Sequence, residues 1–452
     1  MPFATVVAVE SDDMVELGGG EKTEEKEEPP TEDAQGRPIL GKGEAGILID
    51  GKSGNVLYEV NSEKKMYPAS TTKVMTALVA LDAVKAGKVS LKQKVTVTAE
   101  MLEGLAWDGS NMALKEGEII SFQNLLYGLM IPSGNDAAMA IAYAVSGSRA
   151  GFVDAMNNKA KKLGLKNTHF KNHHGLHDEE HYTTAADMAV IARAAMKNET
   201  FRSIVEIAHV KIPPTNLTEE ERYYINTNGL VSTMRYSQYY YPGATGIKTG
   251  YTDEAGNCLV ASAEKNGIEL ITVLFHGEGV ENSHKDTARL LDYGFSAFEL
   301  VTPVREDQIM GEVKVKWGRS KDSVTLSAVA PVSVLVPKGT KTEELEIKLN
   351  LPEFVKAPVE KGTLTGSVSV FLDDVEIGGG ELHTDLTVKR SFFWPAYAFL
   401  EWLWGFLLIR ILCYLVLSVL GLFVLLILLR IWQEIDRARR HKKRQQRYSG
   451  RK

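Results

Sequence analysis

The sequence predicts an α+β fold in which an antiparallel sheet lies between helices, followed by a small all-β domain and a C-terminal transmembrane helix. Three observations support this prediction. Between residues 70 and 197 apolar residues recur with helical spacing, and strand-like alternation occurs on either side of this block. Over 303–388 only short alternating runs remain. From Ile411 to Leu429 the chain is uncharged and mostly apolar, and as a helix it would span roughly 28 Å, close to a bilayer core.

Composition narrows the class of protein. With 452 residues the chain has room for two or three units with sizeable cores, and its net charge of -6 is too mild for a nucleic-acid-binding surface, so we expect no such partner. A disulfide between Cys258 and Cys413 is not expected, because Cys413 lies inside the apolar run. Residues 1–42 are acidic and poor in large apolar side chains, which predicts a flexible leader.

Residues 43–300 are predicted to form one domain. The expected strands are Ala45–Ile49, Val56–Val60, Gly246–Thr249, Cys258–Ala263 and Leu270–Phe275. The expected helices are 70–86, 121–131, 136–146, 151–163, 185–197 and 284–299. Helices placed between outer strands are typical of an α+β sandwich built on an antiparallel sheet.

The remainder is predicted to be a β domain and a membrane anchor. Short alternating runs indicate an all-β domain over 303–388, and a transmembrane helix is expected at 405–432. The basic tail 433–452 predicts a single-pass protein with a cytoplasmic C-terminus and its other domains outside the cell membrane. A buried core helix or an amphipathic surface helix is the alternative, but the run has no polar face. The apolar stretch Met1–Val9 does not make a complete export signal.

Ser70 and Lys73 form a candidate catalytic pair. They open the helix predicted from residue 70, where their i, i+3 spacing puts both side chains on one face. A serine needs a base to act as a nucleophile at neutral pH, and burial beside a second cation would favour the neutral amine of Lys73. The same spacing recurs at Ser62–Lys65 and Ser262–Lys265, but neither begins a helix with an apolar face.

Two further motifs place polar side chains at the ends of predicted elements. Ser133 and Asn135 lie in a tight turn between helices and can face a cleft, although helix capping explains them equally well. Lys248 and Thr249 lie at a strand end and can bind a carboxylate, and Gly250 permits close approach of a substrate backbone. Alone, that motif is more simply a strand followed by a turn glycine.

Taken together, and in this order, the three motifs resemble those of low-molecular-weight D-alanyl-D-alanine carboxypeptidases, a group of penicillin-binding proteins. The likeness runs from about residue 44 to 390 and is strongest over 67–78, 130–138 and 246–256. It implies the fold shared by penicillin-binding proteins, transpeptidases and β-lactamases. The family usually has a signal peptide and often an amphipathic C-terminal helix, and this chain departs from that pattern at both ends.

The resemblance also implies a role for each motif residue in the first two motifs. Ser70 would attack the carbonyl between two D-alanines and form an acyl-enzyme, and Lys73 would take its proton. Ser133 would pass that proton to the leaving D-alanine. Asn135 would hold the substrate amide. The implied substrates are peptidoglycan stem peptides, and β-lactam antibiotics would inhibit by acylating the same serine.

In the third motif, the resemblance implies that Lys248 and Thr249 bind the terminal carboxylate next to Gly250. The backbone N–H groups of Ser70 and Tyr251 would form the oxyanion hole. Related functions stay open: a D,D-endopeptidase acting on cross-links, a β-lactamase, or an inactive wall-binding scaffold. The sequence does not predict an oligomeric state.

Five histidines cluster between the predicted helices: His169, His173, His174, His177 and His181. The segment His177–His181 lacks the His-Glu-x-x-His pattern of a zinc site, because aspartate follows the first histidine. We therefore expect solvated loop histidines, no metal and no cofactor.

Overall fold

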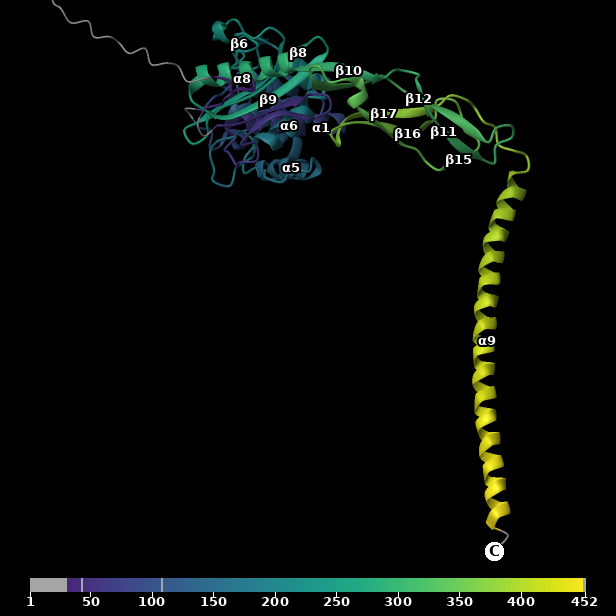
Figure 1. Ribbon diagram of the computed structural model, residues 1–452. Helices are drawn as coiled ribbons and strands as arrows, with labels where there is room; N and C mark the ends of the chain where they lie inside the picture. The colour runs from purple at the N-terminus through teal and green to yellow at the C-terminus, as the bar shows by residue number, and fades with distance from the viewer. Residues whose placement is uncertain (1–30, 42–43, 107–108, 450–452) are drawn as a thin grey trace, which may run out of the picture. The chain divides into compact units, whose positions relative to one another are not determined.

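The computed structural model describes residues 31–41, 44–106 and 109–449, which divide into two compact units (Figure 1). The first unit runs to Ile49 and continues through Val56–Glu264 and Leu270–Gly294. The second contains the loops Asp50–Asn55 and Lys265–Glu269 together with the chain from Phe295 onwards. The stretch Met1–Val9 and most of the acidic leader lie outside the described residues.

The described end of the leader, residues 31–41, makes hydrogen bonds that the sequence did not predict. The backbone N–H of Ile39 donates to the carbonyl of Thr31 at 2.9 Å, closing a turn. The hydroxyl of Tyr58 donates to the carbonyl of Pro38 at 2.5 Å. These bonds tie the segment to the first unit, and the polar composition of the leader gave no sign of them.

A five-stranded sheet forms the centre of the first unit, in the order β2-β1-β9-β8-β7. Its strands are β1 (Ala45–Asp50), β2 (Val56–Val60), β7 (Ala244–Thr252), β8 (Gly256–Lys265) and β9 (Ile268–Gly277). β7 pairs antiparallel with β8, with Lys248 opposite Val260, and β1 pairs antiparallel with β2. Helix α8 (Gly279–Ala297) lies along one side of the strands, with α5 and α6 on the other (Figure 1). The predicted α+β class is therefore confirmed, and β7 is an edge strand.

The helical block begins with a short 3-10 turn, η1 (Ala69–Thr72), which leads directly into α1 (Lys73–Lys85). Helix α1 is buried almost all round, which explains its nearly continuous apolar sequence. The other helices are α2 (Ala99–Leu102), α3 (Phe122–Met130), α4 (Asn135–Ser146), α5 (Arg149–Lys162), α6 (Ala185–Met196) and α7 (Glu199–Val205). Side chains such as Ser121 and Thr184 begin these helices by accepting a backbone N–H.

Some elements differ from the expectation. Helix α8 begins at Gly279 rather than at residue 284, because its first turn is polar and carries little apolar periodicity. Two further two-stranded sheets were not predicted, because their strands are too short to show a clear alternation. They are β3 (Lys94–Thr96) with β4 (Ile119–Ser121), and β5 (His209–Ile212) with β6 (Arg222–Ile225).

The second unit contains a two-stranded sheet, β10-β13, and a six-stranded sheet in the order β14-β16-β17-β12-β11-β15. The strands are β10 (Phe298–Val304), β11 (Ile309–Lys316), β12 (Ser323–Ala328), β13 (Val332–Pro337), β14 (Glu346–Asn350), β15 (Phe354–Lys356), β16 (Leu364–Leu372) and β17 (Val375–Thr384). Alternate residues such as Val324, Leu326, Val368 and Val370 form its core. This is the all-β architecture that the alternating runs predicted.

A single helix, α9 (Trp394–Ser449), follows the strands of the second unit. Its segment Arg410–Lys442 has a mean hydropathy of 3.0 in its most apolar window, none of which is buried. A helix this apolar and this exposed needs a nonpolar environment, which a bilayer provides. This is the one candidate membrane span among the described residues.

Candidate active site

Ser70 and Lys73 meet where η1 passes into α1. The Nζ atom of Lys73 lies 2.8 Å from Ser70 Oγ, 2.8 Å from Asn135 Oδ1 and 2.7 Å from the backbone carbonyl of His174. Lys73 is completely buried, so its amine reaches only these partners and no solvent. The structure thus brings the first two sequence motifs together around one nitrogen.

The environment of Lys73 favours its neutral form. Burial lowers the pKa of Lys73 well below its ordinary value, the nearby Lys248 cation lowers it further, and the carboxylate of Asp136 opposes them. Burial dominates because an ammonium group loses its hydration in this interior.

The Ser133–Asn135 turn does not cap a helix. Helix α4 has Gly134 as its N-cap residue and no side-chain capping bond. Ser133 has a positive φ of 68°, a backbone conformation that non-glycine residues rarely adopt, and its Oγ is buried with no partner among the described residues. Helix capping by Ser133 or Asn135 is therefore not the explanation of this motif.

The third motif lies on the edge strand β7. Lys248 is buried, its ammonium donates to the carbonyl of Thr249 at 2.9 Å, and burial lowers the pKa of Lys248 to about 7. The hydroxyl of Thr249 donates to Thr227 Oγ1 at 2.7 Å. A Cβ atom on Gly250 would lie 2.8 Å from the backbone N of Ser70, so only glycine lets β7 come this close to η1.

These elements surround a pocket of about 400 Å³ in the first unit. Six of the eight sequence-predicted site residues line it: Ser70, Ser133, Asn135, Thr249, Gly250 and Tyr251. Lys73 and Lys248 are buried and do not line it. The structure therefore brings all eight predicted residues to one site, with six of them lining the pocket and the two lysines buried.

The sequence did not predict that the loop containing His174 and Gly175 helps to form the active site. The carbonyl of His174 binds Lys73, and a Cβ atom on Gly175 would lie 1.9 Å from the carbonyl oxygen of Ala69. Gly175 has a φ of 94°, so glycine is required there for both reasons. The sequence did not predict the role of the His174 carbonyl, because a backbone carbonyl leaves no signature in a sequence.

The same loop corrects the expectation of solvated histidines. His173, His174 and His181 are buried. His181 accepts the backbone N–H of Lys171 on Nδ1 at 3.1 Å, so Nε2 donates to Thr72 Oγ1 at 2.8 Å. Burial lowers the pKa of His173 to about 3 and that of His181 to about 4. Within the described ranges, no group of three or more His, Cys, Asp or Glu side chains is arranged to hold a metal.

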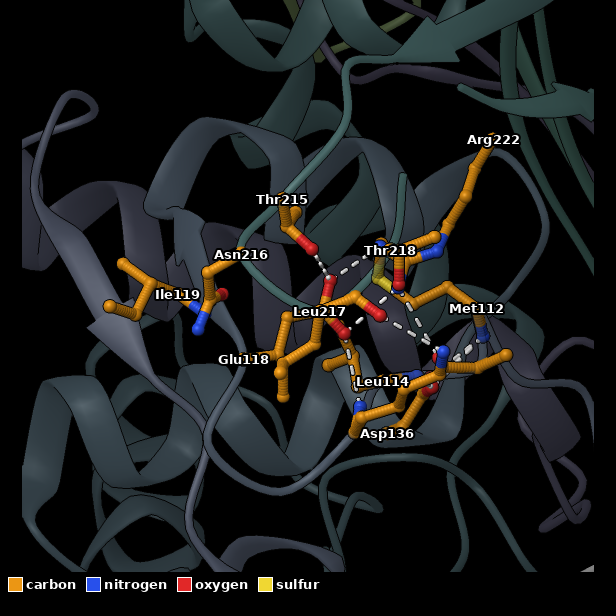
Figure 2. A network of polar contacts seen from close by, with 12 residues as sticks. Met112, Leu114, Glu118, Ile119, Asp136, Thr215, Asn216, Leu217, Thr218 and Arg222 are labelled. Carbon is orange, nitrogen blue, oxygen red and sulfur yellow. Dashed lines mark hydrogen bonds and ion pairs between the residues drawn. The ribbon is translucent and has the colours of Figure 1, made fainter. Parts of the chain in front are cut away.

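A buried polar network formed by Asp136, Glu118 and Arg222 lies next to one wall segment of the pocket, and Figure 2 shows its contacts. The carboxylate of Asp136 accepts the backbone N–H groups of Met112 and Leu114 at 2.9–3.0 Å. Glu118, also fully buried, makes an ion pair with Arg222, with contacts of 2.7 and 2.8 Å. This network fixes the segment 109–118, whose first two residues line the pocket next to Asn135.

A serine paired with a buried lysine, beside the edge strand of an antiparallel sheet covered by helices, defines a serine acyl-transfer enzyme of the penicillin-binding class. The chain belongs to the D-alanyl-D-alanine carboxypeptidase family, whose model matches residues 35–279. A model of the C-terminal domain of penicillin-binding protein 5 matches residues 298–390. These matches confirm the resemblance read from the three motifs.

Individual proteins of this family are also similar to the chain. The chain is 36% identical to the D-alanyl-D-alanine carboxypeptidase DacF of Bacillus subtilis, over 78% of this chain and 88% of that protein. The crystal structure of penicillin binding protein 5 from Haemophilus influenzae superposes with a TM-score of 0.63 at 31% identity, covering 76% of this chain and 97% of that one. The Streptomyces K15 DD-transpeptidase has a TM-score of 0.52 at 32% identity, over 57% and 99%. The protein is accordingly a serine carboxypeptidase of cell-wall synthesis.

Proposed function

We propose that the enzyme removes the terminal D-alanine from peptidoglycan stem pentapeptides through an acyl-enzyme on Ser70. The hydrogen bonds of the Lys73 amine are the observation that supports this proposal. A neutral amine has two N–H groups and one lone pair. Asn135 Oδ1 and the carbonyl of His174 accept the two N–H groups, which leaves the lone pair for the hydroxyl of Ser70 at 2.8 Å. These contacts support the proposed role of Lys73 as the general base.

The reaction then follows from the groups around the pocket. As Lys73 takes its proton, Ser70 Oγ bonds to the carbonyl carbon, and the backbone N–H groups of Ser70 and Tyr251 stabilise the oxyanion. The unpartnered hydroxyl of Ser133 then gives its proton to the amine nitrogen and receives in its place the proton that Lys73 took, as the C–N bond breaks and D-alanine leaves. Asn135 holds the substrate amide. Water next attacks the ester, releasing the shortened peptide and restoring Ser70.

Recognition of the substrate's terminal carboxylate is assigned in part to Thr249, whose side chain lines the pocket. Lys248, which precedes Thr249 on β7, is assigned to the same carboxylate, and its charge also lowers the pKa of Lys73. Gly250 gives the substrate backbone access to η1. β-Lactams, which mimic the D-alanyl-D-alanine end, acylate Ser70 in this scheme.

The chain's place in the cell forms a second part of the proposal. We infer that α9 crosses the cell membrane once, with the first unit and the strands of the second unit outside the cytoplasm. Basic residues follow the apolar segment and should stay in the cytoplasm: Arg430, Arg437, Arg439, Arg440 and Lys442. This orientation brings the pocket to the peptidoglycan.

The proposed function is tested by mass spectrometry and product analysis. Parent protein and Ser70→Ala are incubated with benzylpenicillin, and D-alanine is assayed after addition of a pentapeptide ending in D-alanyl-D-alanine. We expect an adduct that maps to Ser70 and D-alanine release by the parent alone. A folded parent that forms no adduct and releases no D-alanine would refute the proposal, and release only from cross-linked dimers would mark an endopeptidase.

A further inference from the structure

A turn over residues 172–176, the His174 turn, brings a backbone carbonyl to the buried lysine of the active site. The carbonyl of His174 accepts an N–H of Lys73 at 2.7 Å. The side chain of Asn172 closes the turn, because its Oδ1 accepts the backbone N–H of Gly175 at 2.7 Å. These residues belong to no helix or strand. The position of the carbonyl therefore depends on the bonds that fix the turn against η1 and α1.

His181 makes such a bond. Nδ1 of its ring accepts the backbone N–H groups of Lys171 at 3.1 Å and Asn172 at 3.4 Å, so the proton of the neutral ring is on Nε2. Nε2 donates to Thr72 Oγ1 at 2.8 Å, and Thr72 directly precedes Lys73 in the chain. One side chain thus joins the turn that holds the Lys73 amine to the residue next to that lysine.

The surroundings of the His181 ring keep it in one place and in one form. The ring is buried, and its centre lies 5.6 Å from that of Phe170 in an edge contact. Burial lowers the pKa of His181 to about 4, so near neutral pH the ring is uncharged and keeps one arrangement of donor and acceptor. His173 is buried as well, but neither of its ring nitrogens has a partner among the described residues. Of these two rings, only that of His181 links the turn to η1 by hydrogen bonds.

We propose that His181 is a positioning residue for acylation, which keeps the His174 carbonyl at hydrogen-bond distance from the Lys73 amine. This inference rests on the proposed function and deepens it. His181 does not line the pocket, so it acts through Lys73 and not on the substrate. If the carbonyl moved away, the amine would keep only one acceptor, and its lone pair would no longer be directed at Ser70 Oγ. Proton transfer from Ser70 would slow, whereas the residues that bind the substrate would stay in place.

The test uses the full chain in detergent and two single variants that break one hydrogen bond from its opposite ends. His181→Asn keeps an acceptor near the position of Nδ1 but has no group that reaches Thr72. Thr72→Val removes the acceptor and keeps the shape of the side chain. A double variant combines the two changes. His169→Gln is the matched control, since His169 lies shortly before the same turn, but its Nδ1 donates to the carbonyl of Glu180 at 2.6 Å.

Acylation by benzylpenicillin is followed by intact mass at several concentrations, which separates the maximal rate from the half-saturating concentration. We expect each single variant to lower the maximal rate by about tenfold or more and to change the half-saturating concentration by less than about threefold. The value of kcat/KM for D-alanine release should fall by a similar factor. The double variant should be no slower than the slower single variant, because all three lack the same bond. His169→Gln should match the parent.

The final amount of adduct shows whether each variant has folded, and it should reach the level of the parent. If only Thr72→Val reaches this level, that variant decides the test; if neither does, the bond serves folding and the inference is overturned. Parent-like acylation by a folded variant, a change confined to the half-saturating concentration, or additive losses in the double variant would also overturn it. A parent that forms no adduct would instead remove the proposed function, and this inference with it.

Discussion

Two lysines of the first unit, Lys73 and Lys248, are buried almost completely within the same small region. An isolated cation in a protein interior is unfavourable, and here each group responds with a lowered pKa instead of gaining a carboxylate partner at hydrogen-bond distance. Burial of the two lysines is therefore electrostatically unfavourable for folding. In the proposed mechanism it is useful, because a neutral Lys73 is the form that can accept a proton.

The burial of Lys248 predicts how the stability of the folded protein depends on pH. Burial lowers the pKa of Lys248 to about 7, so between pH 7 and about 10.4 the unfolded chain binds a proton that the folded chain does not. Folded stability should rise with pH across this window. We expect the parent to gain stability relative to Lys248→Met between pH 7 and pH 10, by on the order of a few kcal/mol, in urea denaturation at both values.

The control for this experiment is Lys88→Met, which removes an exposed lysine from the same unit. Its stability difference from the parent should be small and nearly the same at both pH values. If Lys248→Met behaved like Lys88→Met, the buried lysine would not carry the pH dependence.

At the scale of elements, the pocket depends on how the segment 109–118 is held. This segment has little regular structure, and its backbone N–H groups find acceptors in side chains from other elements, chiefly Asp136 at the start of α4. The adjacent residue of α4, Asn135, binds Lys73, so one helix start holds both the pocket wall and the base. The ion pair between Glu118 and Arg222 joins β6 to the far end of the segment.

We predict that Asp136→Ala lowers the free energy of unfolding by about 3–5 kcal/mol, because several buried backbone N–H groups lose their acceptor. Asp136→Asn should cost less, since one oxygen remains. Hydrogen exchange at Met112 and Leu114 should accelerate in both variants. Asp154→Asn, on an exposed position of α5, is the control, and equal exchange rates in all variants would show that Asp136 does not hold this segment.

The observed bounds of the helices and strands show which of them a sequence pattern can predict. The strands of the central sheet and helices α3 to α6 were predicted to within a few residues, because each has a long run of apolar residues at one period. The two-stranded sheets β3-β4 and β5-β6 were not predicted, because strands of three or four residues are too short to show a clear alternation.

At the scale of the whole molecule, the chain ends in a helix that no described part of the protein buries. Helix α9 has 56 residues and is about 84 Å long, well over the thickness of a bilayer core. Only Arg410–Lys442 includes the strongly apolar window, and polar residues dominate the helix end beyond it. This distribution fits a membrane anchor that continues as a polar helix beyond the apolar window.

We predict that the full chain stays in the membrane fraction after alkaline extraction, and that a chain ending at Arg390 is released, because the apolar surface of α9 is its only membrane-spanning candidate among the described residues. Protease added outside intact cells should remove both units and leave the basic end protected. Cleavage of that end from outside would contradict the proposed orientation, and release of the full chain would contradict the anchor.

The sequence by itself determined the family, the order of the motifs, the main elements and the membrane helix, because each is written in local spacing or in a long apolar run. Only the tertiary structure decided which groups act on one another. Lys73 is held by Asn135 and His174, which lie 62 and 101 residues away in the chain. The structure also buried Lys248 and joined His181 to Thr72. Burial and the proximity of distant charges set the pKa of a side chain, and neither property exists before the chain folds.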